Sequence, residues 1–348
     1  MPFTPNKFST LESFVSEVTF VPLETKDDCL IGGTIAQAKV HKNLIYINSD
    51  GKQLLVFDLN GKFLREIGKR GQGPGEFINV RDFIFTNEGT IEILDFRKIE
   101  RYSLEGKHLG TVNKFDFLGK DFYCNPHSFC RAFTSGYFLW GGIIEIQDVQ
   151  LLERSRMMYH VNDQMQVVNA YFDTKLGDKM TKDRFKYYKD KILIIPSMYN
   201  YNIYQVNPND SISIRYTFDF GNYGLETKED LDISSGLDTY VHNIDDYVET
   251  DLYLYFSFIY KNRFHYMLYA KKSKQFYIYS SSGNDKDFKL FPAKAVHNDR
   301  LISLLEMYGL KIVMGRMSEE NIKKWGLERF KNSPEDDNPV LVLYKTKF

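Results

Sequence analysis

The segment whose residues could most readily do chemistry is GKRGQGPGEF, from Gly68 to Phe77. Glycine-rich loops beside basic residues can hold phosphate groups on their backbone N–H groups. A P-loop, however, has a lysine and a serine or threonine after its last glycine, whereas Lys69 precedes the glycines here. Gly71, Gly73 and Gly75 are spaced G-x-G-x-G rather than G-x-G-x-x-G, and strand-like sequence follows them. The spacing therefore argues against both nucleotide-binding motifs.

The alternative interpretation of this segment is a tight connection between two strands. Glycine tolerates positive φ, and proline fixes φ at about −65°. We expect these roles for Gly68, Gly71, Gly73, Pro74 and Gly75. Arg70 and Glu76 could pair with each other or cap the loop backbone. Because loops on a rigid scaffold often carry function, both are also candidate ligand-binding residues.

The other reactive side chains form no recognisable motif. The seven histidines are scattered, and neither H-E-x-x-H nor G-x-S-x-G occurs. Cys124 and Cys130 frame CNPHSFC, whose spacing does not match the cysteine pairs of zinc sites. The acidic pairs Asp245–Asp246 and Asp336–Asp337 lie in polar segments and are best interpreted as solvated loop residues. The sequence thus supplies no catalytic residues and no metal ligands, and it leaves any cofactor unknown.

Aromatic residues are the remaining candidates for ligand contact, and they make up 16% of the chain. Sugar rings stack on tyrosine and tryptophan side chains. Tyr199 and Tyr201 lie close together in PSMYNYNIY, and Trp140 precedes two glycines that could leave room for a ligand. Packing between sheets is the competing role for such residues. Trp140, Tyr199 and Tyr201 therefore join Arg70 and Glu76 as candidate ligand-binding residues.

The elements that must position these residues follow a repeated pattern of strands and turns. LIYINSDGKQLLVFDLNGKFLREIG alternates apolar and polar residues, and its Asn-Gly turn is a hairpin signal. The next segment repeats the pattern and predicts strands Thr90–Leu94 and Ile99–Ser103. An aromatic anchor ends the third strand of each repeat, and we assign the anchors to Phe57, Tyr102, Tyr159, Tyr204, Tyr279 and Tyr344. The first two anchors are separated by about the 40–45 residues of a propeller blade.

Six anchors predict an all-β protein, a six-bladed β-propeller of four-stranded antiparallel blades in one domain from 1 to 348. Two insertions are expected, at about 222–250 and 307–338. The second insertion contains a predicted short helix, with Ser318 as its N-cap and Pro334 beyond its end. The last blade lacks a fourth strand, and the unpaired strand at 17–25 could supply it by pairing with 340–347. That pairing would remove two exposed sheet edges.

The overall composition limits the classes of partner. The chain has 45 Lys and Arg against 46 Asp and Glu, a net charge of −1, which argues against nucleic acid. No apolar run approaches the roughly 18 residues of a membrane span. The start MPFTPNKFST lacks a signal-peptide pattern, so we expect either a cytosolic protein or an export signal that has been removed.

Several phrases together resemble a known family. They are FVPLET, GKFLREIGKRGQGPGEF, the ILDF segment that follows, and NPVLVLYK near the end. This chain resembles the six-bladed propeller proteins of Gram-negative gut anaerobes, which are related to NHL-repeat propellers. The resemblance extends over nearly the whole chain and implies the fold. It also implies export to the periplasm or cell envelope, often as a lipoprotein whose anchor would be lost with the removed signal.

Most members of that family have no established activity, so the resemblance implies no catalytic residues. The sequence favours a binding or interaction scaffold over an enzyme, with a glycan, a peptide or a partner protein held at the central face of the propeller. One alternative is a metal-dependent hydrolase or lyase with its site in the central channel. Another is a structural subunit of an envelope complex. Inward-facing Asp, Asn, Glu or His residues from several blades would favour the enzyme.

Overall fold

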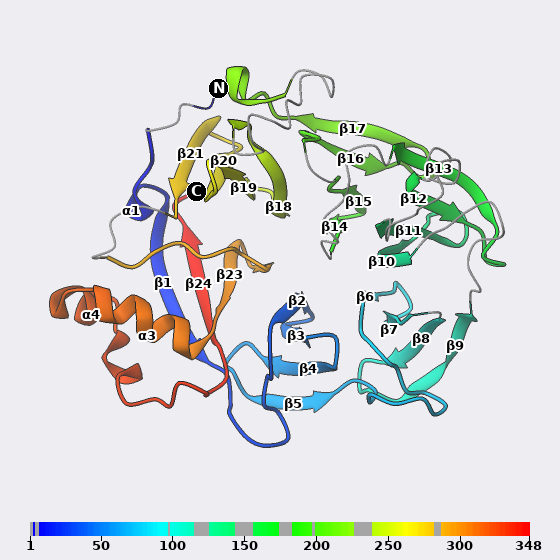
Figure 1. Ribbon diagram of the computed structural model, residues 1–348, viewed down its shortest axis with the longest axis horizontal. Helices are drawn as coiled ribbons and strands as arrows, with labels where there is room; N and C mark the ends of the chain where they lie inside the picture. The colour runs from blue at the N-terminus through cyan, green and yellow to red at the C-terminus, as the bar shows by residue number, and fades with distance from the viewer. Residues whose placement is uncertain are drawn as a thin grey trace. The chain divides into compact units, whose positions relative to one another are not determined.

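The computed structural model describes residues 3, 7–96, 98–114, 125–142, 156–173, 183–196, 199–225, 239–281 and 287–348. These residues form six antiparallel sheets of four strands each (Figure 1). The sheets are the blades of a six-bladed β-propeller, which confirms the predicted fold class. Cys124 lies outside the described residues. No helix in the described part of the chain is long and apolar enough to cross a membrane.

The chain divides into two compact units, and one of them comprises residues 47–55 and 65–218. This unit contains blades 2, 3 and 4, each with its strands in sequence order. Blade 2 consists of β6 (Asp82–Phe85), β7 (Thr90–Leu94), β8 (Lys98–Ser103) and β9 (His108–Lys114). Blade 3 consists of β10 (Asn125–Arg131), β11 (Tyr137–Gly142), β12 (Arg156–Val161) and β13 (Val167–Asp173). Blade 4 consists of β14 (Phe185–Tyr188), β15 (Lys191–Ile194), β16 (Asn202–Val206) and β17 (Ile212–Thr217).

The other unit comprises residues 1–46, 56–64 and 219–348, and it contains blades 5 and 6. Blade 5 follows the short 3-10 helix η1 (Gly221–Tyr223) and consists of β18 (His242–Glu249), β19 (Tyr253–Tyr260), β20 (Arg263–Ala270) and β21 (Gln275–Ser280). Blade 6 has the order β22 (Ala295–His297), β23 (Arg300–Leu305), β24 (Val340–Thr346) and β1 (Val15–Pro22). Blade 1, formed by β2 (Ile35–His41), β3 (Leu44–Ser49), β4 (Gln53–Asp58) and β5 (Phe63–Glu66), draws residues from both ranges.

The N-terminal strand completes the sixth blade, as the sequence predicts. β1 pairs antiparallel with β24, from Val15 opposite Thr346 to Pro22 opposite Val340 (Figure 1). The short helix α1 (Leu11–Phe14) leads into this strand. The strand begins two residues before the predicted range and ends at Pro22, where proline can no longer donate to a ladder. The pairing covers an edge of β24 that would otherwise be exposed.

Helices lie between β23 and β24. They are α3 (Met307–Arg316), α4 (Glu319–Lys324) and the 3-10 helix η4 (Leu327–Phe330). The N-cap prediction is confirmed, because Ser318 Oγ accepts a hydrogen bond from the Asn321 N–H at 3.2 Å. Buried residues of this segment, such as Leu310 and Leu327, pack into the same core as Val340 and Val342 of β24. The helices therefore add a layer over the sixth blade.

One sequence-based assignment is wrong in blade 5. Tyr279 lies in β21, the fourth strand, whereas the other five anchors lie in third strands. The third strand is β20, and it is followed by AKKSK, which has no glycine to signal a hairpin. Residues 226–238 of the expected insertion at 222–250 lie outside the described residues, and its described part contains β18, the first strand of the blade. Its pairing with β19 shifts register twice, and these irregularities hide the alternation by which a strand is recognised.

Candidate functional site

The glycine-rich loop connects β5 of blade 1 to β6 of blade 2 and is held against the outer strands of blade 2. The Tyr102 hydroxyl donates a hydrogen bond to the carbonyl oxygen of Gly75 at 3.0 Å. Lys98 Nζ donates to the carbonyl oxygen of Glu76 at 2.5 Å. The carboxylate of Glu76 accepts from the Gly73 N–H at 2.8 Å. The loop thus uses its polar groups to fix its own backbone.

Close packing explains its glycines. Gly75 has a φ of +74°, and a Cβ there would approach the ring of His108 to 2.7 Å. A Cβ at Gly71 would collide with the Glu76 carboxylate. Arg70 is exposed, and its Nε donates to the carbonyl oxygen of Ile78 at 3.3 Å. Among the described residues no ion pair joins Arg70 to Glu76; both cap the backbone. Their role in ligand binding stays a prediction.

The three aromatic candidates occupy different surroundings. Trp140 of β11 is completely buried, with its ring 5.4 Å from that of Phe172 and 5.9 Å from the guanidinium of Arg184. Tyr199 and Tyr201 are half-buried and lie together just before β16. The three candidates therefore do not share one segment: Trp140 belongs to β11, and the two tyrosines precede β16. The burial of Trp140 favours packing as its role, and ligand contact by all three stays a prediction.

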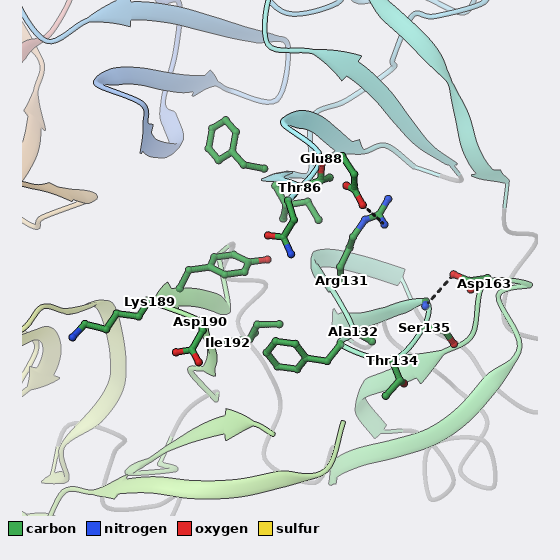
Figure 2. Close-up of a pocket in the computed structure, with 16 residues that line it drawn as sticks. Thr86, Glu88, Arg131, Ala132, Thr134, Ser135, Asp163, Lys189, Asp190 and Ile192 are labelled. Atoms are coloured by element: carbon green, nitrogen blue, oxygen red, sulfur yellow. Dashed lines mark hydrogen bonds and ion pairs between the residues drawn. The ribbon is translucent and has the colours of Figure 1, made fainter. Parts of the chain in front are cut away.

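Within blades 2 to 4 the structure contains a cleft of about 530 Å³ that the sequence did not indicate (Figure 2). It lies over four hairpin turns, which join β6 to β7, β10 to β11, β12 to β13 and β14 to β15. Two aromatic side chains in its lining are exposed to solvent, Phe133 by 42% and Tyr187 by 49%. Its volume is in the range of clefts that hold small molecules. We call it the turn cleft.

The turn from β10 to β11 carries Phe133 and is fixed from two sides. Asp163 of the β12–β13 turn accepts a hydrogen bond from the Gly136 N–H at 3.0 Å (Figure 2). Gly136 has a φ of +75°, and a Cβ there would lie 1.9 Å from the carbonyl oxygen of Val161. Only glycine fits this close approach to the neighbouring strand.

The second support comes from the next blade. Asp210, in the turn between β16 and β17, is 5% exposed and accepts from the N–H groups of Phe133 at 2.7 Å and Thr134 at 2.9 Å. It also accepts from the Thr134 hydroxyl. His160 lies beside them, with Nε2 3.2 Å from the carbonyl oxygen of Ser135. A buried carboxylate that receives three donors holds the backbone that carries Phe133.

The other two turns are short and regular. In the β6–β7 turn, the hydroxyls of Thr86 and Thr90 lie 2.8 Å apart, and the Gly89 N–H donates to the carbonyl oxygen of Thr86 at 3.0 Å. The β14–β15 turn has only Lys189 and Asp190 between its strands, and Lys189 has a φ of +55°. A two-residue turn of this kind fixes the direction of both strands. The cleft is therefore built on rigid hairpins.

A charged cluster between blades 2 and 3 reaches the lining of the cleft through Arg131. Glu92 of β7 is fully buried and accepts hydrogen bonds from Arg101, at 2.7 and 3.1 Å, and from Arg131. The Tyr137 hydroxyl donates to the same carboxylate at 3.2 Å. Arg131 also faces Glu88 at 3.9 Å across the cleft wall (Figure 2). The pKa of Arg131 is raised, because the hydrogen bond with Glu92 stabilises the cation.

The side chains of the cleft indicate contacts with a ligand and do not indicate a particular reaction. Its carboxylates, amide and hydroxyls can hydrogen-bond a ligand, and its two exposed rings can stack on one. Within the described residues, no three His, Cys, Asp or Glu side chains are grouped so as to hold a metal ion. Sequence reasoning missed Phe133 and Tyr187 because each lies in or beside a hairpin turn without a motif. The signal was a large aromatic residue in RAFTSG and in FKYYKDK, where turns usually carry small polar residues.

Solved structures share the fold. One of them is the crystal structure of BF0058 from Bacteroides fragilis NCTC 9343, whose name provisionally describes it as an exported protein. Its sequence is 18% identical, and the match covers 95% of both chains with a TM-score of 0.76. A member of the DUF4221 family from Bacteroides vulgatus is 13% identical, with a TM-score of 0.53 over 96% of this chain and 97% of that one. At these identities the likeness concerns the fold.

The sequence itself identifies the family. No curated protein matches it. The profile of the domain of unknown function DUF4934 matches residues 5–345. This agrees with the resemblance to propellers of gut anaerobes, since the similar structures come from Bacteroides. The chain therefore belongs to the DUF4934 family, and it has the fold of a six-bladed β-propeller.

Proposed function

We propose that this propeller is a binding protein that holds a glycan in the turn cleft. The observation that supports this most strongly is the exposure of Phe133 and Tyr187 in one cleft. Other aromatic residues of the same blades, such as Phe138 and Tyr159, are completely buried. Complete burial of such a side chain contributes about 1.5–3 kcal/mol, and each half-exposed ring forgoes part of that hydrophobic stabilisation. A ligand that covers them would recover part of it.

A sugar fits the mixture of groups in the cleft. Each sugar ring has an apolar face that can lie on an aromatic ring and a rim of hydroxyls that need hydrogen-bond partners. Side chains of Asn87, Thr86 and Asp190 line the same cleft and can supply those partners. The net charge of the lining is small, with Lys189 and Arg131 among several carboxylates, so a neutral ligand pays no large electrostatic penalty. A peptide is the competing ligand class.

The location proposed for this activity is the periplasm or the cell envelope. The family resemblance supports this, and so does the similarity of fold to BF0058. A lipid anchor on an upstream segment would keep the propeller at a membrane surface. Fractionation of cells that express the complete gene tests the location, and recovery in the cytosol would contradict it.

A glycan array is the direct test of ligand class. The wild-type chain is applied beside the double variant Phe133→Ala, Tyr187→Ala and beside Phe264→Ala, which removes a ring of similar exposure from blade 5. We expect the wild type and Phe264→Ala to bind the same glycans. The double variant should bind them at least about tenfold more weakly, as expected when stacking anchors are lost.

Two outcomes would contradict the proposal. One is binding that the double variant retains in full, which would place the ligand elsewhere. The other is a wild-type chain that binds no glycan while it binds members of a peptide library, which would replace the glycan with a peptide. Circular dichroism of each variant checks that it is folded.

A further inference from the structure

The N-terminal segment inserts one side chain into an aromatic pocket of blade 5. Phe3 is only 4% exposed, although it lies at the start of the chain. Its ring centroid lies 5.3–6.2 Å from the rings around it, in edge-to-face arrangements. These rings, which we call the Phe3 pocket, belong to Phe220, Tyr223, Phe258, Tyr260 and His265.

The walls of the Phe3 pocket also support one another. Phe220 and Phe258 lie 5.4 Å apart, and Tyr223 and Tyr260 lie 5.5 Å apart. The rings of Phe258 and His265 stack at 5.3 Å. These contacts join β19, β20 and the segment around η1, and they do not include Phe3. The pocket is therefore organised by blade 5 and its neighbouring segment rather than by its occupant, as in a preformed binding site.

Further along the segment, two more residues hold it to the same blade. The ring of Phe8 stacks on that of His265 at 5.4 Å with 20° between their planes. The Ser9 N–H donates to the carbonyl oxygen of Ile278 at 2.7 Å, and the Ile278 N–H donates to Ser9 Oγ at 3.3 Å. Ile278 belongs to β21, the outermost strand of blade 5. A backbone pairing at a sheet edge combined with side-chain pockets is a recurrent mode of peptide recognition.

We propose that blade 5 carries a peptide-binding site, formed by the Phe3 pocket and the outer edge of β21, which the protein's own N-terminal segment occupies. The partner it fits is an extended peptide with two aromatic residues five positions apart, the second followed by a serine or threonine. This is the pattern of Phe3, Phe8 and Ser9. The site is independent of the turn cleft, which lies in blades 2 to 4.

The tether determines how strongly an external peptide can compete. A segment joined to its site by a few residues acts at an effective concentration in the millimolar range. The intact chain should therefore bind a free peptide weakly, and a chain whose own segment lacks its anchors should bind the same peptide well. That contrast shows whether the pocket recognises the aromatic anchors when the covalent tether is absent.

The test is a titration of the full-length variant Phe3→Ala, Phe8→Ala with the fluorescent peptide MPFTPNKFST, followed by fluorescence anisotropy. We expect saturable binding at least about tenfold tighter than to the wild-type chain. The same peptide with Phe3→Ala should bind at least about tenfold more weakly, a loss of about 1.4 kcal/mol. Absence of saturable binding to the folded variant, or equal affinity of the two peptides, would overturn the proposal.

A second variant addresses loss of structure in the first. In Ser9→Pro both aromatic anchors remain, and the two hydrogen bonds between Ser9 and Ile278 are removed. If the double variant is unfolded by circular dichroism, recovery of its native spectrum on addition of the peptide supports the site. If the spectrum does not recover and Ser9→Pro binds the peptide no better than the wild type does, the site does not exist.

Discussion

Phe133 and Tyr187 have surroundings that the identity of the residue alone does not reveal. Both are large aromatic residues, and both lie in or next to hairpin turns. The sequence indicates Tyr199, Tyr201 and Trp140 as candidates by residue type, and Trp140 also by the two glycines that follow it. Burial, however, depends on which neighbour covers a ring, and Trp140 is covered completely. Residue type therefore predicts which side chains could stack on a ligand, and only the packed structure shows which of them a ligand can reach.

Glu92 is the residue on which the charged wall of the cleft depends. Replacing it in Glu92→Gln removes the buried carboxylate that both Arg101 and Arg131 share and leaves these partly buried cations without their nearest counterion. We expect the free energy of unfolding to fall by about 2–3 kcal/mol. Glu88→Gln is the matched control, because Glu88 is well exposed and its ion pair with Arg131 is long. Its effect should stay within about 0.5 kcal/mol. Urea denaturation measures both, and equal losses would refute this assignment.

His265 makes the stability of blade 5 dependent on pH. Burial lowers its pKa from the ordinary value of 6.5, and Arg263 adds to the effect, whereas a backbone hydrogen bond with Tyr260 opposes it. The unfolded chain therefore takes up a proton at His265 more readily than the folded chain does. We therefore expect the contribution of His265 to stability to be fully present above pH 6.5 and to be lost as the pH falls below that value.

The variant His265→Phe keeps an aromatic ring and removes the titrating group. The denaturation midpoint of the wild type should fall more between pH 7.5 and pH 5.5 than that of the variant. Identical pH profiles would show that His265 makes no contribution.

Hairpin turns are the elements that position the cleft. The sequence predicts such turns well where they contain Asn-Gly or Glu-Gly, as in the first two blades. It fails at AKKSK, where no glycine marks the turn and the aromatic pattern therefore indicates an anchor one strand too late. It also cannot reveal that Asp210 holds the turn of Phe133, because the two residues are far apart in the chain. Such contacts between blades can be recognised only once the sheets are assembled.

Removal of the carboxylate in Asp210→Ala tests the role of that turn. Two backbone N–H groups lose their acceptor, so we expect a loss of about 2–4 kcal/mol in the free energy of unfolding. Glycan affinity should fall as well, because the backbone of Phe133 is released. Asp58→Ala is the control, since Asp58 also accepts from two backbone N–H groups, those of Asn60 and Lys62, in a turn of blade 1. It should lower stability without changing affinity. If both variants bind equally well, Asp210 does not position the site.

Comparison of two glycines separates the energetic cost of backbone strain from that of a steric collision. Gly136 and Gly89 have nearly the same φ, +75° and +76°, but a Cβ at Gly89 would meet nothing within 4 Å. Gly89→Ala should cost about 1 kcal/mol from the left-handed conformation alone. Gly136→Ala should cost about 2–4 kcal/mol because its Cβ also collides with the Val161 carbonyl oxygen. Thermal unfolding compares the two, and similar melting temperatures would contradict the collision.

At the scale of the whole molecule, the fold follows from the repeat and from the way the last blade is completed. Alternating strands with aromatic anchors predicted six blades, and an unpaired strand at each end of the chain predicted that β1 would pair with β24. The sequence predicts the two helices before β24 only in part. The polar sequence after Met317 indicates α4 through its N-cap and acidic first turn, whereas α3 begins directly after a strand at Met307 without a side-chain cap.

Deletion of residues 1–25 removes β1 and exposes one edge of β24. We expect a large loss of stability, seen as a strongly lowered melting temperature or as aggregation of the purified protein. Deletion of residues 1–10 is the control, because it removes the N-terminal segment and keeps β1. A chain that lacks residues 1–25 and melts like the wild type would show that the strand is dispensable.

A crystal structure with a bound oligosaccharide tests the central claim most directly. The ligand would be the glycan that the array identifies as the strongest binder. The account predicts its electron density in the turn cleft, with a sugar ring stacked on Phe133 or Tyr187 and its hydroxyls within hydrogen-bond distance of Asn87 or Asp190. Density confined to another part of the propeller, such as the glycine-rich loop of Arg70 and Glu76 or the segment of Tyr199 and Tyr201, would contradict it.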